Sequence, residues 1–199
     1  MMEPRELVAF AEAAVDQVEP IFRSGLGAAP ARFKGQGDFA TEVDLVIEQQ
    51  LRDILTQMTG IPVYGEESGG SVLDTVWVVD PIDGTANYSA GNPMAGILVA
   101  LIHEGAPVAA VSDFPLLGRR LVTCDGSPLR SVGGPATGFG GGDEAMGFDE
   151  ARGHVGCSSH LPTEIFHELR ETGLRPRMTG SVAVSYTHLR AHETPEHLV

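Results

Sequence analysis

Residues 76–85, VWVVDPIDGT, lead an apolar run directly into two carboxylates, Asp80 and Asp83, placed three residues apart. The run is built from β-branched and aromatic residues, which predicts a buried strand that ends at Asp80. Pro81 fixes its own φ and holds the residue before it extended. Two carboxylates at one strand end cannot both stay ionised in a cleft without cations between them. The stretch therefore predicts a layered α/β chain with a cation site at the edge of its sheet.

The residues after Pro81 add groups that suit a phosphate. The Ile82 carbonyl is left free as a further oxygen ligand, and Gly84 permits close approach of the backbone. Thr85 can open a helix whose first N–H groups favour an anion. Hard oxygen ligands of this kind suit Mg²⁺. Asp-Pro-x-Asp-Gly is also a common turn composition, so the metal-site interpretation depends on the other motifs.

Composition limits the classes of protein to consider. The chain has 199 residues, 42% of them hydrophobic, which is enough for a substantial core. Its formal net charge of −14 disfavours nucleic acid as a partner and suits a site that collects cations. Cys124 and Cys157 are the only cysteines, so no disulfide framework is expected. No signal segment or long apolar run is recognised, so we expect a soluble cytoplasmic protein without a membrane partner.

Two amphipathic helices precede the strands. The first begins near Pro4, and its apolar face is formed by Leu7, Val8, Ala11, Ala14, Val15, Val18 and Phe22. The second follows Thr41, a natural N-cap with Asp44 in the capping-box position. Its predicted apolar face consists of Ile47, Leu51, Ile54 and Met58. Further strands are expected at 63–64, 96–102, 107–114 and 121–124.

Three other motifs contain candidate site residues. The strand at 63–64 ends in Gly65-Glu66-Glu67, a second pair of acids at the carboxyl end of a strand, where sites of layered α/β proteins usually lie. The other two are residues 34–44, which contain one lysine and two aspartates, and residues 177–181, which contain Gly-Ser. Alone, Glu66 and Glu67 would be interpreted as a solvated pair. The combination of all four motifs favours a site.

Taken together, DFATEVD, GEES and WVVDPIDGTANY resemble the N-terminal signatures of the inositol monophosphatase family, which comprises lithium-sensitive, Mg²⁺-dependent phosphatases. The resemblance covers roughly residues 5–184. It implies alternating layers of helix and sheet and, in the intact protein, a homodimer. It also implies two-metal catalysis, in which one Mg²⁺ activates a water and the second neutralises the leaving alkoxide.

The resemblance implies metal ligands residue by residue. Glu66 would bind the first Mg²⁺ together with Asp80, the Ile82 carbonyl and Thr85. Asp80 and Asp83 would hold the second. A further aspartate, from a Trp-Asp motif late in the second lobe of the family, has no counterpart here, because Trp77 is the only tryptophan.

The remaining roles concern water and substrate. Asp44 would accept a hydrogen bond from Thr85 and help it to position and deprotonate the attacking water, so the implied catalytic residues are Asp44, Glu66 and Thr85. Lys34, the only lysine, would lie beside an outer metal position together with Glu67. The implied phosphate- and substrate-binding residues are Asp83, Gly84, Thr85, Gly180, Ser181 and Val182.

A small phosphorylated polyol is the expected substrate, and Asn87-Tyr88 favours myo-inositol 1-phosphate over nucleotides. Histidinol phosphate, fructose 1,6-bisphosphate and 3′-phosphoadenosine nucleotides are alternatives within the family. A non-catalytic protein of the same fold that binds metal or dimerises is an alternative of another class.

The domain prediction has three parts. Residues 1–150 form an N-terminal metal-binding lobe, and residues 151–184 begin a C-terminal α/β lobe that is incomplete. Residues 185–199 contain three histidines at spacings unlike a metal site and contain no glycine, and we interpret them as a non-native tail. On this interpretation the chain is an inactive fragment; a natural short form is the alternative.

Overall fold

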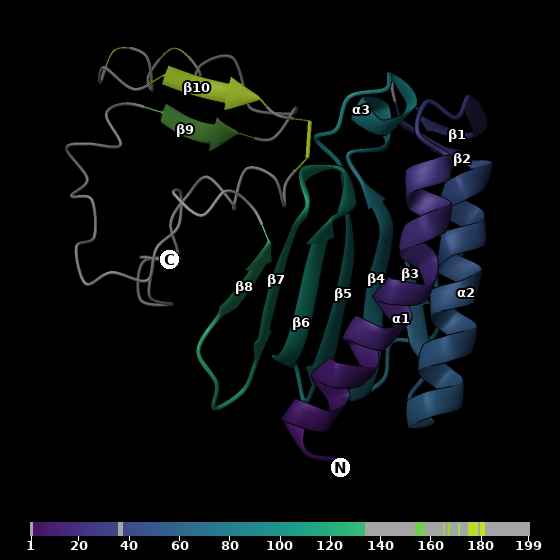
Figure 1. The fold of residues 1–199 in the computed structure, drawn as a ribbon, viewed down its shortest axis with the longest axis vertical. Coiled ribbons are helices and arrows are strands. Elements are labelled where there is room, and N and C mark those ends of the chain that lie inside the picture. Colours follow the sequence, from purple (N-terminus) through teal and green to yellow (C-terminus); the bar gives the residue numbers. More distant parts are fainter. Residues whose placement is uncertain are drawn as a thin grey trace. The chain divides into compact units, whose positions relative to one another are not determined.

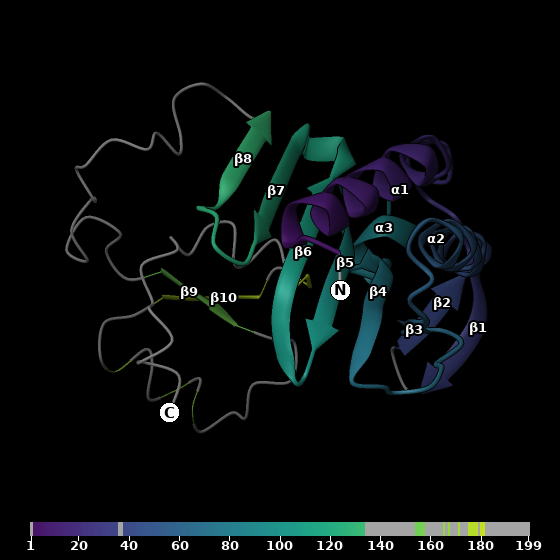
Figure 2. The same ribbon diagram turned by 90° about the horizontal axis from the view of Figure 1, so that it is seen from below.

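The computed structural model describes residues 2–35, 38–133, 154–157, 165, 167, 171, 175–178 and 180–181. The chain forms two compact units, residues 1–134 and 135–199, and each is described by itself. The first unit is a six-stranded sheet with two long helices, α1 (Pro4–Ser24) and α2 (Glu42–Thr59), packed on one face (Figures 1 and 2). This is the layered α/β architecture that the sequence predicts.

The order of strands in the sheet is β3-β4-β5-β6-β7-β8. The strands are β3 (Val63–Gly65), β4 (Thr75–Asp83), β5 (Gly96–His103), β6 (Ala106–Phe114), β7 (Arg119–Cys124) and β8 (Arg130–Gly133). A short 3₁₀ turn, η1 (Pro115–Leu117), connects β6 and β7. β3 pairs with β4 in parallel, and every other neighbouring pair in this sheet is antiparallel.

Strand β4, next to the edge strand β3, is longer than its sequence predicts. Its regular pairing with β5 runs to Asp80, breaks, and resumes where Asp83 lies opposite Gly96. The strand therefore continues through Pro81 instead of ending at Asp80. The break in register, which is typical of a β-bulge, falls within the Asp-Pro-Ile-Asp segment.

Helix α1 begins and packs as predicted. Pro4 occupies its first turn, Glu3 and Glu6 form a capping box, and all seven predicted apolar residues are buried. Helix α2 has the predicted Thr41 cap and ends at Gly60, whose φ of 70° is favourable only for glycine. Three residues of its predicted apolar face are confirmed, because Ile47 and Leu51 are buried and Ile54 packs against the core. The buried residues Asp44, Glu48 and Leu55 were not predicted to lie on that face.

A hairpin that the sequence analysis did not predict precedes α2. It consists of β1 (Pro30–Gly35) and β2 (Asp38–Thr41), which pair antiparallel. The rings of Phe33 and Phe39 lie 6.2 Å apart across it. The hairpin, the start of α2 and the short helix α3 (Thr85–Ser89) lie at the same end of the main sheet (Figure 1).

The second unit contains β9 (His154–Cys157) and β10 (Arg175–Met178), which pair in parallel. The proposed lobe boundary near residue 150, Val182 and the proposed tail 185–199 lie outside the described residues. In the described part of the chain, no helix is long and apolar enough to cross a membrane.

Candidate active site

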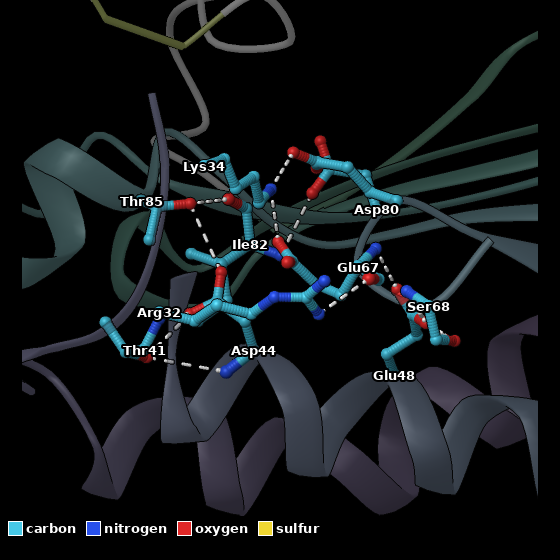
Figure 3. Close-up of polar contacts among 11 residues, drawn as sticks. Arg32, Lys34, Thr41, Asp44, Glu48, Glu67, Ser68, Asp80, Ile82 and Thr85 are labelled. Carbon is cyan, nitrogen blue, oxygen red and sulfur yellow. Dashed lines mark hydrogen bonds and ion pairs between the residues drawn. The ribbon is translucent and has the colours of Figure 1, made fainter. Parts of the chain in front are cut away.

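The candidate site lies where four segments of the first unit meet. These are the end of β3, the end of β4, the start of α2 and the β1–β2 hairpin, and they contribute the polar side chains drawn in Figure 3. The parallel pairing of β3 with β4 brings their carboxyl ends to one edge of the sheet. The two acidic motifs are therefore neighbours because of sheet topology, although the sequence separates them.

Thr85 and Asp44 are in direct contact. The Thr85 hydroxyl lies 3.2 Å from Asp44 Oδ1 and 2.9 Å from the Ile82 carbonyl oxygen. The other oxygen of Asp44 accepts the Thr41 amide at 2.8 Å and the Thr41 hydroxyl at 2.6 Å. Burial raises the pKa of Asp44, and these hydrogen bonds oppose that rise by favouring the carboxylate. Asp44 is thus both the helix-capping acid and the partner of Thr85.

The Ile82 carbonyl is engaged rather than free, because it accepts the Thr85 hydroxyl. A carbonyl oxygen has a second lone pair, so a metal could still bind there. The amide of Ile82 donates to Asp80 Oδ1 at 3.1 Å, which fixes the Asp80 carboxylate against its own loop. Gly84, at φ 86°, turns the chain from β4 into α3 and is the N-cap of α3.

Negative charge accumulates around Asp80. Burial raises its pKa well above the ordinary aspartate value, and the neighbouring charges of Glu66 and Asp83 raise it further. A carboxyl group in this position is protonated more readily than one in water unless a cation is nearby. The loop after β3 and the end of β4 thus together favour a bound cation.

Lys34 is the cation that the structure places among these acids. Its ammonium nitrogen lies 2.7 Å from Glu66 Oε1 and 2.6 Å from Glu67 Oε1. Burial lowers the pKa of Lys34, but its hydrogen bonds to Glu66 and Glu67 and their charges raise the pKa above the usual lysine value overall. Arg32 donates to the Glu67 carbonyl at 3.1 Å, so the hairpin contacts the loop through two residues.

The donor set fits a hard divalent cation in its chemistry. Lys34 contacts the carboxylates of Glu66 and Glu67, while Asp80 lies near the charges of Glu66 and Asp83. The side chain of Glu67 is only 1% exposed. Among the described residues, Oε2 of Glu67 has no hydrogen-bond partner. No three acidic, histidine or cysteine side chains in those residues converge as a ready-made metal cluster. Lys34 occupies the space next to Glu66 and Glu67 that a cation would share.

Two residues at the site were missed by the sequence analysis. Glu48 is 2% exposed, accepts the Glu67 amide at 2.6 Å and the Ser68 amide at 3.0 Å, and is contacted by Arg52 at 3.3 Å. The sequence feature that could have identified Glu48 and Arg52 is their spacing. They follow Asp44 at intervals of four residues, which places all three on the same side of α2. Of the predicted substrate residues, Gly180 and Ser181 belong to the second unit.

Comparison of the sequence with known proteins identifies the family to which the chain belongs. The sequence model of the "Inositol monophosphatase family" matches residues 3–193. The chain is 40% identical over 194 residues to "Inositol-1-monophosphatase ImpA" of Mycolicibacterium smegmatis, covering 93% of this chain and 70% of that protein. It is 47% identical over 131 residues to "Probable inositol 1-monophosphatase ImpA" of Mycobacterium tuberculosis, covering 65% of this chain and 48% of that protein.

Solved structures agree on the fold. An IMPase from Thermotoga maritima superposes with a TM-score of 0.73 at 23% identity, covering 89% of this chain and 69% of that chain. The suhB protein of Bartonella henselae gives a TM-score of 0.72 at 21% identity, covering 90% and 72%. With a family match over most of its length and close named relatives, this chain belongs to the inositol monophosphatase family of phosphoric monoester hydrolases.

Proposed function

We propose that the protein hydrolyses a small phosphorylated polyol, myo-inositol 1-phosphate first among them, with Mg²⁺ as the required cofactor. One observation carries the proposal. Thr85, hydrogen-bonded to Asp44, stands beside the Asp80–Asp83 carboxylates in a chain that is 40% identical to an inositol-1-monophosphatase.

The metal ligands follow from the donor set. Glu66, Asp80, the Ile82 carbonyl and Thr85 would hold one Mg²⁺, and Asp80 with Asp83 would hold a second. Bound there, the ions would supply a water of lowered pKa and would neutralise charge on the leaving oxygen. Lys34 would have to yield its contact with Glu66, because an ammonium group and a divalent cation compete for the same oxygens.

The protein's own groups would orient the reacting atoms. Asp44 is held by Thr41, so its second oxygen is fixed to accept the Thr85 proton. Thr85 Oγ1 would accept a proton from the attacking water as the hydroxyl passes its own proton to Asp44. The backbone at Gly84 and Thr85 would contact the phosphate, and Gly180, Ser181 and Val182 would contact the polyol ring.

We also propose that the active form is a homodimer, which sedimentation would test.

The test is phosphate release from a panel of substrates with and without Mg²⁺. The panel contains myo-inositol 1-phosphate, histidinol phosphate, fructose 1,6-bisphosphate and 3′-phosphoadenosine 5′-phosphate. Histidinol phosphate is included because a "Histidinol-phosphatase" of Mycobacterium tuberculosis is 37% identical over 113 residues, 44% of that protein. From a chain whose residues from 185 onward are replaced by the matching segment of the Mycolicibacterium smegmatis relative, we expect Mg²⁺-dependent release, highest with myo-inositol 1-phosphate and abolished in Asp80→Asn.

Two outcomes would contradict the proposal in different ways. A preference for another member of the panel would replace the substrate and leave the reaction class intact. Release from none of them by the chain with the replaced segment would favour the non-catalytic alternative, in which the same fold only binds metal or dimerises. The panel is also run on the unaltered chain, and release equal to that of the chain with the replaced segment would favour the natural short form over a non-native tail.

A further inference from the structure

Side chains on one side of α2 contact both the segment after β4 and the loop after β3. Asp44, Glu48 and Arg52 are spaced four residues apart and lie one helical turn above another. Figure 3 shows Asp44 directed toward Thr85 and Glu48 directed toward Ser68, with both side chains rising from the same helix. The helix thus links the segment after β4 to the loop after β3.

Glu48 binds the backbone of that loop. Its Oε2 accepts the Glu67 amide at 2.6 Å, and its Oε1 accepts the Ser68 amide at 3.0 Å and also the Ser68 hydroxyl. Hydrogen bonds to a buried carboxylate are shorter and stronger than those between neutral groups. The carboxylate of Glu48 therefore fixes the peptide planes on both sides of Glu67, immediately after Glu66.

Arg52 also binds this loop through hydrogen bonds. It donates to the Ser68 hydroxyl at 2.7 Å, to the Gly69 carbonyl at 2.9 Å and to the Val63 carbonyl. It also pairs with Glu48 at 3.3 Å, which compensates the buried negative charge. The two residues leave the loop from Glu66 to Gly69 few alternative conformations.

We propose that Glu48 is a positioning residue that holds Glu66 and Glu67 at a fixed place relative to Asp44 and Thr85, and so sets the affinity of the site for divalent cations. The inference rests on the proposed function in one respect, because it takes Glu66 to be a metal ligand. Glu48 itself binds no metal and no substrate. Loss of the Glu48 carboxylate should weaken metal binding. It should change the rate at saturating metal much less than it changes the metal affinity.

The informative substitution is Glu48→Gln. Both carboxylate oxygens of Glu48 accept hydrogen bonds, so the NH₂ group of a glutamine would face a donor in either orientation. Two variants on the same helix serve as controls. Leu55→Ala removes a fully buried side chain that is not part of the loop contacts, and Asp53→Asn alters an exposed carboxylate bonded to Gln49.

The first readout is hydrogen exchange of the metal-free chain. We expect the Glu67 and Ser68 amides to exchange faster in Glu48→Gln and to be unchanged in Asp53→Asn. The second readout is titration with Mn²⁺ alone, followed by electron paramagnetic resonance. We expect the Mn²⁺ affinity of Glu48→Gln to fall about tenfold or more, as is typical when a residue supporting metal ligands is lost. Leu55→Ala should lose stability and retain its Mn²⁺ affinity.

A further variant tests the contact if Glu48→Gln does not fold. Ser68→Ala deletes the hydroxyl that donates to Glu48 and accepts from Arg52, and it leaves the Glu48 bonds to the two amides in place. We expect a smaller loss of Mn²⁺ affinity in the same direction. Equal Mn²⁺ affinity in wild type and in these variants would overturn the inference alone. A wild-type chain that binds no Mn²⁺ would overturn the proposed metal site and the inference with it.

Discussion

The Thr85 hydroxyl lies between two acceptors, 3.2 Å from Asp44 Oδ1 and 2.9 Å from the Ile82 carbonyl oxygen. A hydroxyl has one proton, so Thr85 can fully donate to only one of them at a time. Donation to Asp44 leaves the Ile82 carbonyl available to a cation, and donation to Ile82 leaves one oxygen of Asp44 without its partner. Metal binding and the hydrogen bond to Asp44 should therefore favour each other.

Removal of the Thr85 hydroxyl tests this arrangement. In the chain whose residues from 185 onward are replaced by the relative's segment, Thr85→Ala deletes the group that would position the attacking water, and we expect kcat/KM for myo-inositol 1-phosphate to fall about 10²- to 10⁴-fold. Thr85→Ser keeps the hydroxyl and should retain most of the rate, as measured by phosphate release at saturating Mg²⁺. Equal activity in the alanine and serine variants would show that the hydroxyl has no catalytic part.

The Lys34–Glu67 pair should contribute to the stability of the metal-free protein. The Glu67 side chain is 1% exposed, so Lys34→Ala would leave a buried carboxylate without its cation. We expect the free energy of unfolding to fall by about 1–3 kcal/mol, a range reduced because Lys34 itself is partly exposed. The measurement is urea denaturation in EDTA.

An exposed ion pair provides the control for Lys34→Ala. Arg23 and Glu19 form an i,i+4 pair on α1 in which Arg23 is exposed and Glu19 is partly exposed, so Arg23→Ala should cost at most about 0.5 kcal/mol. Adding Glu67→Gln to Lys34→Ala should restore part of the lost stability, because the buried charge is then gone. Additive effects of these two substitutions would contradict a direct interaction.

The pH dependence of stability follows from Asp80. Its pKa is raised by burial and by the charges of Glu66 and Asp83, so the folded protein binds more protons than the unfolded chain between the two pKa values. The unfolding free energy of the metal-free protein should therefore be greatest at low pH in this window and fall as pH rises through the folded-state pKa. Burial also raises the pKa values of Asp44 and Glu67, which gives the same sign.

Asp80→Asn isolates this contribution. Asparagine does not ionise, so the variant should be more stable than the wild type in EDTA at neutral pH and should show a shallower fall with rising pH. Urea denaturation across the pH range measures both effects, and Asp53→Asn, an exposed site on α2, should keep the wild-type slope. A slope that is unchanged in Asp80→Asn would assign the pH dependence to other carboxylates.

The parts of the fold that could be predicted depend on local sequence. The β-branched run before Asp80 forms a strand because its own residues favour extended backbone, and Thr41 caps α2 because its hydroxyl reaches the amides of Val43 and Asp44. Sheet topology then places the end of β3 beside the end of β4, because the two strands pair in parallel.

The parts that could not be predicted depend on contacts between distant segments. The family resemblance placed Lys34 near Glu67, but nothing local to Lys34 indicates the hairpin that carries it there, because β1 is exposed along its length and lacks an alternating apolar pattern. The buried face of α2 includes Glu48 because the loop after β3 offers it amide donors. A charged residue on that face can be explained only when its partners are known.

Gly65→Ala tests how closely α2 approaches the loop. A Cβ built on Gly65 would lie 2.1 Å from Cδ of Glu48, closer than any real contact, so the Glu48 carboxylate or the strand end must move. We expect a loss of about 1–3 kcal/mol in the free energy of unfolding, as for other overpacked sites. Gly35→Ala is the matched control, because a Cβ there meets nothing within 4 Å, and it should change stability by no more than about 0.5 kcal/mol. Glu48→Ala combined with Gly65→Ala should cost less than the sum of the two single variants, since the shorter side chain removes the clash; strictly additive losses would show that the destabilisation arises elsewhere.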